Sequence, residues 1–224
     1  MRQIVLDTET TGLDPLAGHR IVEIGCLELV NHIPTGENFH AYVNPERDVP
    51  EEVVRVHGLT QAFLRSHPVF ADLADGFLDF IGDTELVIHN AAFDLAFLNA
   101  ELDRAGRPQL DPSRCIDTLL LARRKFPGAP ASLDALCRRF GVDNSARDKH
   151  GALLDSELLA EVYLELIGGR EPGLSLVVGG GEAASGAAVV ERTFRAPRPH
   201  GPSETELVAH AALLARLKNP LWEA

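Results

Sequence analysis

The stretch RQIVLDTETTG, residues 2–12, decides the fold class of this chain and most of its chemistry. Its apolar run at residues 4–6 predicts a buried strand, and strand side chains alternate between the two faces. Asp7 and Glu9 therefore share one face at the end of that strand. Two neighbouring carboxylates repel each other, so burying them is costly unless they are paired, protonated or bound to a cation. We therefore expect a cation site there.

Oxygen ligands alone suit hard divalent cations such as magnesium or manganese. Two such ions about 4 Å apart activate water and stabilise the leaving oxygen in phosphodiester cleavage. Two alternatives stay open for this segment by itself. One is a polar strand end without chemistry. The other is a phosphatase with an aspartyl nucleophile, whose motif Asp-x-Asp-x-Thr would have an aspartate where this chain has the longer Glu9.

Two further acidic positions follow along the chain. Asp94 ends the stretch HNAAFD and lies in the first turn of a predicted helix that directly follows a strand. Such an acid often has only a structural role, in which it stabilises the helix by interacting with the helix dipole. Ligand sites of open α/β sheets, however, also lie beyond strand ends. His150 and Asp155 are five residues apart, which is a rotation of about 140° on one helix. They converge only if His150 lies in the loop before the helix, as the stretch DKHG at 148–151 indicates. Together the three acidic elements predict a metal-dependent nuclease.

The remaining patterns predict strands that first follow one another and then alternate with helices, which favours a mixed α/β sheet. The expected strands are residues 2–8, 20–30, 37–44, 85–89 and 115–118. The expected helices are 51–56, 60–65, 69–81, 92–105, one that ends at 126, 132–140 and 152–167.

The composition changes after Gly169. Residues 170–202 are rich in glycine and proline, which predicts a flexible linker. Ser203 and Glu206 then form an S-x-x-E capping box, and apolar residues recur at helical spacing up to the stop at 219–220. We expect a nuclease domain at 1–169, a linker at 170–202 and a C-terminal segment at 203–224 that begins with an amphipathic helix at 203–218.

The formal net charge is −12 and the pI is about 5.1, which argues against non-specific nucleic-acid binding. A metal-filled acidic site reverses the local sign, however. Basic groups at 123–125, 138–139 and 147–149 offer local contacts, or are simply solvated helix faces. The three cysteines are widely spaced and form no CxxC pair, so we expect neither a zinc knuckle nor disulfides. We also expect no signal peptide, no membrane span and a cytoplasmic location.

The ordered set Asp7, Glu9, Asp94, His150 and Asp155 resembles the DEDD superfamily of 3'-to-5' exonucleases, in the subgroup with histidine near the last aspartate. Within it, the chain is most similar to the family of proofreading subunits of bacterial DNA polymerase III. The similarity covers essentially the whole chain and is carried by DTETTG (7–12), HGLT (57–60) within residues 50–60, VIHNAAFD (87–94) and HGALLDSELLAEVY (150–163).

The resemblance implies a ribonuclease H-like fold, with a five-stranded mixed sheet flanked by helices and a flexible tail. It also implies two divalent cations, Mg²⁺ or Mn²⁺, and release of nucleoside 5'-monophosphates from single-stranded or frayed 3' DNA ends. The metal ligands would be Asp7, Glu9, Asp94 and Asp155, and the general base would be His150, since histidine titrates near neutral pH. Substrate contacts are implied at Asp7, Glu9, Thr10, Thr11, Glu52, His57, His89 and Asp155. For Glu52 and His57, an exposed pair on a short helix is the alternative.

The resemblance extends to the tail, where 203–224 would bind the catalytic alpha subunit of the polymerase. Residues 173–177 (GLSLV) lie where the family carries a sliding-clamp motif, but they lack its leading glutamine and closing phenylalanine. Two other functions remain open: an exoribonuclease of the same superfamily, and a non-catalytic interaction module on a polymerase. The tail argues against the first alternative, and the intact acidic set argues against the second.

Overall fold

The computed structural model describes residues 1–145, 149–169 and 201–216. The chain divides into one unit that ends at Ser175 and a second that begins at Leu176. Most of the expected linker, the stretch 173–177 and residues 217–224 lie outside the described residues.

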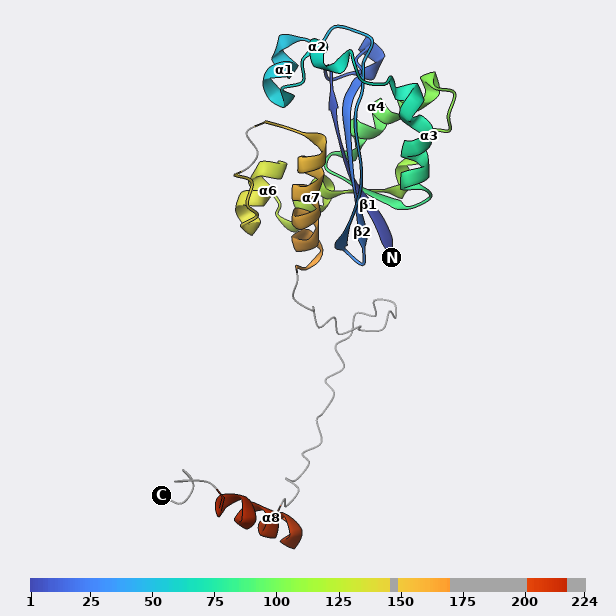
Figure 1. Cartoon of the computed structure of the whole chain (residues 1–224). Helices are drawn as coiled ribbons and strands as arrows, with labels where there is room; N and C mark the ends of the chain where they lie inside the picture. The colour runs from blue at the N-terminus through green and yellow to red at the C-terminus, as the bar shows by residue number, and fades with distance from the viewer. Residues whose placement is uncertain (146–148, 170–200, 217–224) are drawn as a thin grey trace, which may run out of the picture. The chain divides into compact units, whose positions relative to one another are not determined.

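The first unit is built on a five-stranded mixed sheet with the order β3-β2-β1-β4-β5 (Figure 1). β1 pairs antiparallel with β2 and parallel with β4, and β4 pairs parallel with β5. The mixed sheet predicted from the sequence is therefore confirmed. Its strands are β1 (Arg2–Thr10), β2 (Ile21–Val30), β3 (Ile33–Tyr42), β4 (Glu85–Ile88) and β5 (Cys115–Asp117).

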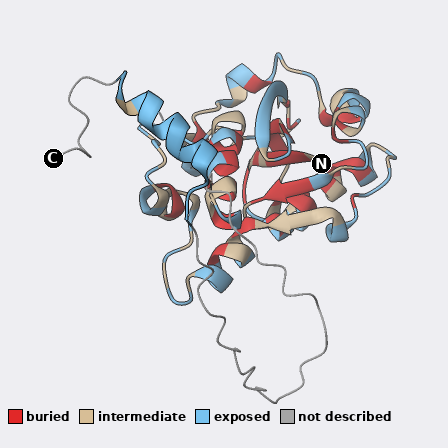
Figure 2. Cartoon of the chain, turned by 90° about the horizontal axis from the view of Figure 1, so that it is seen from below, coloured by how far each residue is buried: buried red, intermediate tan, exposed pale blue. Residues whose placement is uncertain are grey.

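Helices cover both faces of this sheet (Figure 1). Ile4 and Leu6 of β1 belong to the apolar cluster on the side of α3 and α4, whereas Val5 packs with α7 on the other side. The alternation along β1 thus directs Asp7 and Glu9 to the α7 side. Buried residues line the sheet and the inner helix faces in Figure 2. The helices are α1 (Glu51–His57), α2 (Gln61–Leu64), α3 (Phe70–Ile81), α4 (Ala91–Arg104), α5 (Thr118–Lys125), α6 (Leu133–Phe140) and α7 (Ala152–Ile167), with 3-10 turns η1 (Pro15–Ala17) and η2 (Pro112–Arg114).

The limits of β3 and β1 differ from the sequence prediction by more than one residue. The expected start of the third strand at residue 37 is wrong, because β3 begins at Ile33. Asn31 and His32 both have positive φ, 52° and 65°, and form a two-residue hairpin turn between β2 and β3. Proline and glycine in residues 33–36 read as loop signals, yet an edge strand such as β3 tolerates them. β1 in turn extends to Thr10, with a bulge at Glu9/Thr10.

In the second unit, Ser203 caps α8 (Glu204–Leu214) through the expected capping box. Apolar residues of α8 surround the helix axis, since Leu207 and Leu214 lie on one side and Val208 and Leu213 on others. The expectation of an amphipathic helix is therefore wrong, and all four residues are at least partly exposed. Among the described residues, no helix combines the length and apolar character that a membrane span requires.

Candidate active site

The site lies where the parallel strands end. Leu6 of β1, Ile88 of β4 and Asp117 of β5 are in register, so the residues that follow them meet at one edge of the sheet. An open pocket of about 260 Å³ lies at this edge. It is lined by Asp7, Thr8, Glu9, His89, Phe93, Asp94, Ser132, Leu133, Asp134, His150 and Asp155.

The first turn of α7 brings Asp155 to this pocket. It packs directly on Gly25 of β2, the residue that pairs with Asp7 across the sheet. A side chain at Gly25 would place its Cβ 2.2 Å from the backbone carbon of Ala152. Ser156 is fully buried and donates its hydroxyl to the Gly25 carbonyl oxygen at 3.0 Å. The missing side chain and this hydrogen bond together place Asp155 above β1 and β2.

Asp94 is held from the opposite side of β1. The backbone N–H and the hydroxyl of Thr8 both donate to its Oδ1, at 3.0 and 2.7 Å. Thr8 points away from Asp7 and Glu9, which is the alternation of a strand. Asp94 is 3% exposed, so its carboxylate is held in a buried position beside the pocket. Sequence reasoning missed this role of Thr8, because it depends on a contact across 86 residues.

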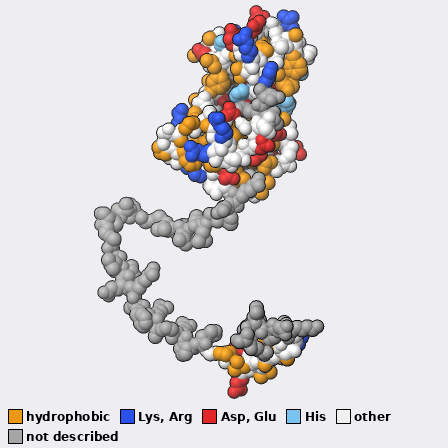
Figure 3. Space-filling view, turned by 90° about the vertical axis from the view of Figure 1, so that its left-hand side faces the viewer, with side chains coloured by type: hydrophobic (Ala, Val, Ile, Leu, Met, Phe, Trp, Pro, Cys, Tyr) orange, Lys and Arg blue, Asp and Glu red, His pale blue; other side chains and the backbone are white. Residues whose placement is uncertain are grey.

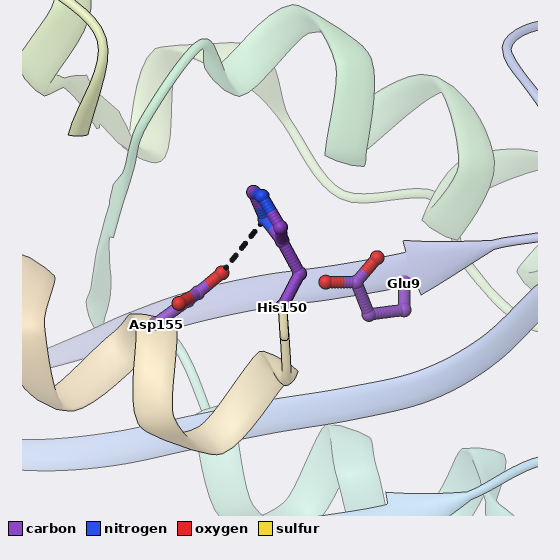
Figure 4. Close-up of side chains that lie close together, drawn as sticks. All are labelled: Glu9, His150 and Asp155. Atoms are coloured by element: carbon purple, nitrogen blue, oxygen red, sulfur yellow. Dashed lines mark ion pairs between the residues drawn. The ribbon is translucent and has the colours of Figure 1, made fainter. Parts of the chain in front are cut away.

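His150 lies on the loop before α7, as the sequence predicted. Its Nδ1 is 3.3 Å from Oδ2 of Asp155, and its backbone N–H donates to the Val56 carbonyl of α1 at 3.1 Å. Donor atoms of Glu9, His150 and Asp155 all lie within 4.8 Å of one another (Figure 4). A loop histidine and two carboxylates from separate elements therefore converge.

The electrostatics of the pocket fit bound cations. Burial, reinforced by neighbouring carboxylates including Asp155, raises the pKa of Glu9 to about 8, although His150 acts in the opposite direction. Burial also raises the pKa of Asp94 to about 7, against the hydrogen bonds from Thr8. Carboxylate oxygens that resist ionisation in the metal-free protein are the ligands that a hard divalent cation stabilises. The donor set therefore fits Mg²⁺ or Mn²⁺.

The other residues implied as substrate contacts divide into two groups. His89 lines the pocket, its Nδ1 2.9 Å from the Thr118 hydroxyl, and burial lowers its pKa. The remaining four do not line the pocket. Thr10 and Thr11 are buried, Glu52 is exposed on α1, and His57 is buried at the end of α1.

Two of the basic residues named from the sequence have local structural contacts, and residue 147 lies outside the described residues. Lys125 donates to the last carbonyls of α7, at Glu165 and Leu166, and Arg139 lies 4.4 Å over the ring of Phe126. In Figure 3, lysine and arginine side chains appear in separate groups on this face, interspersed with acidic ones. The described residues thus form no continuous basic track on the face that Figure 3 shows.

Comparison with known proteins extends these observations. Residues 4–163 match the model of the family described as Exonuclease. The DNA polymerase III subunit epsilon of Rickettsia felis is 50% identical over 97% of both chains. The subunit of the same name from Escherichia coli is 44% identical over all of this chain and 98% of its own.

Solved structures give the same fold. One of exonuclease X in complex with 5' overhanging duplex DNA covers 74% of this chain and 90% of its own, with a TM-score of 0.59 and 25% identity. The nuclease domain of 3'hExo, a DEDDh family member bound to rAMP, covers 74% of this chain and 91% of its own, with a TM-score of 0.64 and 20% identity.

Proposed function

Because this chain belongs to the exonuclease family and to its DNA polymerase III epsilon subunits, we propose that it removes mispaired 3'-terminal nucleotides from DNA during replication. It is a 3'-to-5' exonuclease, and its family implies divalent metal ions. The products would be nucleoside 5'-monophosphates. One observation carries the proposal: the four expected carboxylates and His150, which come from β1, α4, the first turn of α7 and the loop before it, line a single pocket.

Asp7, Glu9, Asp94 and Asp155 would hold two cations, Mg²⁺ or Mn²⁺, as oxygen ligands. When bound, these ions supply charge stabilisation at the scissile phosphate and at the leaving 3'-oxygen. Thr8 fixes one oxygen of Asp94 and so directs the other oxygen. The turn packed on Gly25 orients Asp155 in the same way.

His150 takes a proton from the attacking water. Its Nδ1 faces Asp155, which assigns the proton-accepting role to Nε2. Imidazole suits a general base at neutral pH because its ordinary pKa lies close to that pH. The hydrogen bond from its backbone to α1 fixes the loop on which it is carried.

The substrate is a single-stranded or frayed 3' end. Backbone contacts and base stacking hold such an end without reading its sequence, and a mispaired end costs less free energy to unpair. We place Thr10, Thr11, Glu52, His57 and His89 as substrate contacts on family resemblance.

The tail is the proposed anchor to the polymerase. Helix α8 exposes Leu207, Val208 and Leu213, which are 52, 71 and 52% exposed. A helix with apolar residues all round is typical of one that becomes enclosed, so we expect the catalytic alpha subunit to surround α8. A linker at 170–202 would keep the nuclease at high local concentration. Binding of the sliding clamp is proposed for residues 173–177, although that stretch lacks the leading glutamine and the closing phenylalanine of the motif.

The test compares a 3'-mispaired DNA primer with an RNA of the same sequence in Mg²⁺ or Mn²⁺. We expect rapid removal of the DNA mismatch, slow removal from RNA, and loss of nearly all activity in Asp7→Ala with the fold retained. Faster degradation of RNA would favour the exoribonuclease. Unchanged activity of Asp7→Ala would refute the metal assignment, and an inactive wild type would leave only the interaction module.

A further inference from the structure

Helix α4, which carries Asp94, begins without a cap of its own. Asn90, at its N-cap position, is in the left-handed conformation with φ 66° and makes no side-chain cap hydrogen bond. The first N–H groups of a helix need acceptors from elsewhere when no local side chain provides them. Here the acceptor comes from another strand, because Asn90 and Ala91 donate to Oδ1 and Oδ2 of Asp117 at 3.3 and 3.2 Å.

The same carboxylate also caps α5. Leu119 and Leu120 donate their backbone N–H groups to Oδ1 of Asp117 at 2.9 and 3.2 Å. One half-buried side chain thus satisfies four N–H groups at the start of two helices. A carboxylate suits this position, since it offers two acceptor oxygens and its charge is favourable at both positive helix ends.

What this carboxylate fixes is the connection between β4 and α4. Thr118, the next residue, places its hydroxyl 2.9 Å from Nδ1 of His89. Asp94 follows in the first turn of α4, where Thr8 holds it from β1. The segment from His89 to Asp94 is therefore tied to the end of β5 by Asp117 and to the start of α5 by Thr118, while Thr8 of β1 holds the Asp94 carboxylate.

We propose that Asp117 is a positioning residue for the reaction: it sets where Asp94 stands relative to Asp7 by capping α4 from the neighbouring strand. The inference rests on the proposed function. Asp117 does not line the pocket, so it acts through Asp94.

Asp117→Ser separates the two caps. Serine is as good an N-cap as aspartate, so α5 keeps its cap. Its single, shorter-reaching oxygen cannot also serve Asn90 and Ala91. Asp117→Asn retains one carbonyl oxygen and should lie between wild type and serine. The matched control is Asp111→Ser, since Asp111 caps η2 through Ser113 at 2.8 Å and lies outside the pocket.

The measurements are kcat and KM on a single-stranded DNA oligonucleotide, Mn²⁺ affinity by calorimetry, and thermal unfolding. For Asp117→Ser we expect kcat to fall by about tenfold or more and Mn²⁺ binding to weaken several-fold, as for other residues that orient metal ligands. KM should stay within about twofold, because a residue that orients a metal ligand changes the placement of that ligand and leaves the substrate contacts in place. Asp111→Ser should match the wild type in all three.

Wild-type kcat and Mn²⁺ affinity in a folded Asp117→Ser would overturn the proposal. The proposal would also be overturned if both Asp117 variants lost kcat only near their unfolding temperatures and matched the wild type at lower temperatures. That pattern would mean that the substitutions lower stability alone. The Mn²⁺ titration needs no substrate. If the wild type binds Mn²⁺ but does not degrade DNA, the proposed function fails while the positioning role is still measured.

Discussion

Gly25→Ala tests whether close packing of β2 and α7 sets the site. The added Cβ would lie 2.2 Å from the backbone carbon of Ala152 and 2.3 Å from the nitrogen of Leu153. Ordinary contact begins at 3.4 Å, so the first turn of α7 must retreat by about 1.2 Å. Asp155 would move with it, because its N–H donates to Gly151 within that turn at 2.8 Å.

A displacement near 1 Å of a catalytic group costs about 100-fold in rate. We therefore expect kcat of Gly25→Ala to fall about 100-fold on a 3'-labelled single-stranded oligonucleotide in saturating Mg²⁺. Overpacking should also cost about 1–3 kcal/mol of stability, which thermal unfolding measures. The control is Gly76→Ala in α3, where a Cβ finds its nearest atom at 3.9 Å. A folded Gly25→Ala whose kcat stays within about threefold of wild type would refute the reasoning.

The site and the tail allow three more tests. His150→Gln should keep Mn²⁺ affinity but slow hydrolysis about 100-fold and lose the acid limb of its pH–rate profile, and an unchanged profile would assign the base elsewhere. Without metal, wild type should lose stability relative to Glu9→Gln as pH rises from about 5 to 8, because the folded-state pKa of Glu9 is raised to about 8 and ionisation opposes folding; parallel unfolding curves across that range would contradict this. A chain ending at Gly169 should degrade free DNA normally but fail to co-elute with the polymerase subunit in gel filtration. Trp222→Ala should weaken co-elution, because Trp222 lies in the proposed polymerase-binding segment and tryptophan is a frequent interface anchor. Co-elution of the truncated chain would place the interface on the nuclease domain.

The sequence was sufficient to predict that the acidic residues lie together, because the position of each one depends on a local pattern. An apolar run fixes the strand under Asp7 and Glu9, and a loop before a helix lets His150 and Asp155 converge. The register of the sheet then brings Asp94 close to Asp7 and Glu9, because parallel β1 and β4 end at the same edge.

The supporting residues could not be read in this way. Thr8 and Asp117 act through hydrogen bonds that link distant parts of the chain, and their local patterns indicate only a strand residue and a helix cap. A glycine within a strand indicates only a locally less stable strand. The packing role of Gly25 depends on α7, which follows more than 120 residues later. Periodicity predicts which face a side chain takes, but it does not predict what meets that face.

The chain deals with buried carboxylates in two contrasting ways. Glu101 is 1% exposed, and Arg20 binds both its oxygens at 2.5 and 2.8 Å. The pocket differs, since no lysine or arginine stands among the described residues that line it. Asp94 is held by Thr8 instead, through neutral groups that fix its position without cancelling its charge. A buried carboxylate with only a structural role would be stabilised by a paired arginine, as Glu101 is by Arg20. In the pocket, burial raises the pKa of both Glu9 and Asp94, so ionisation of these carboxylates is costly, and the proposed cations would offset that cost on binding.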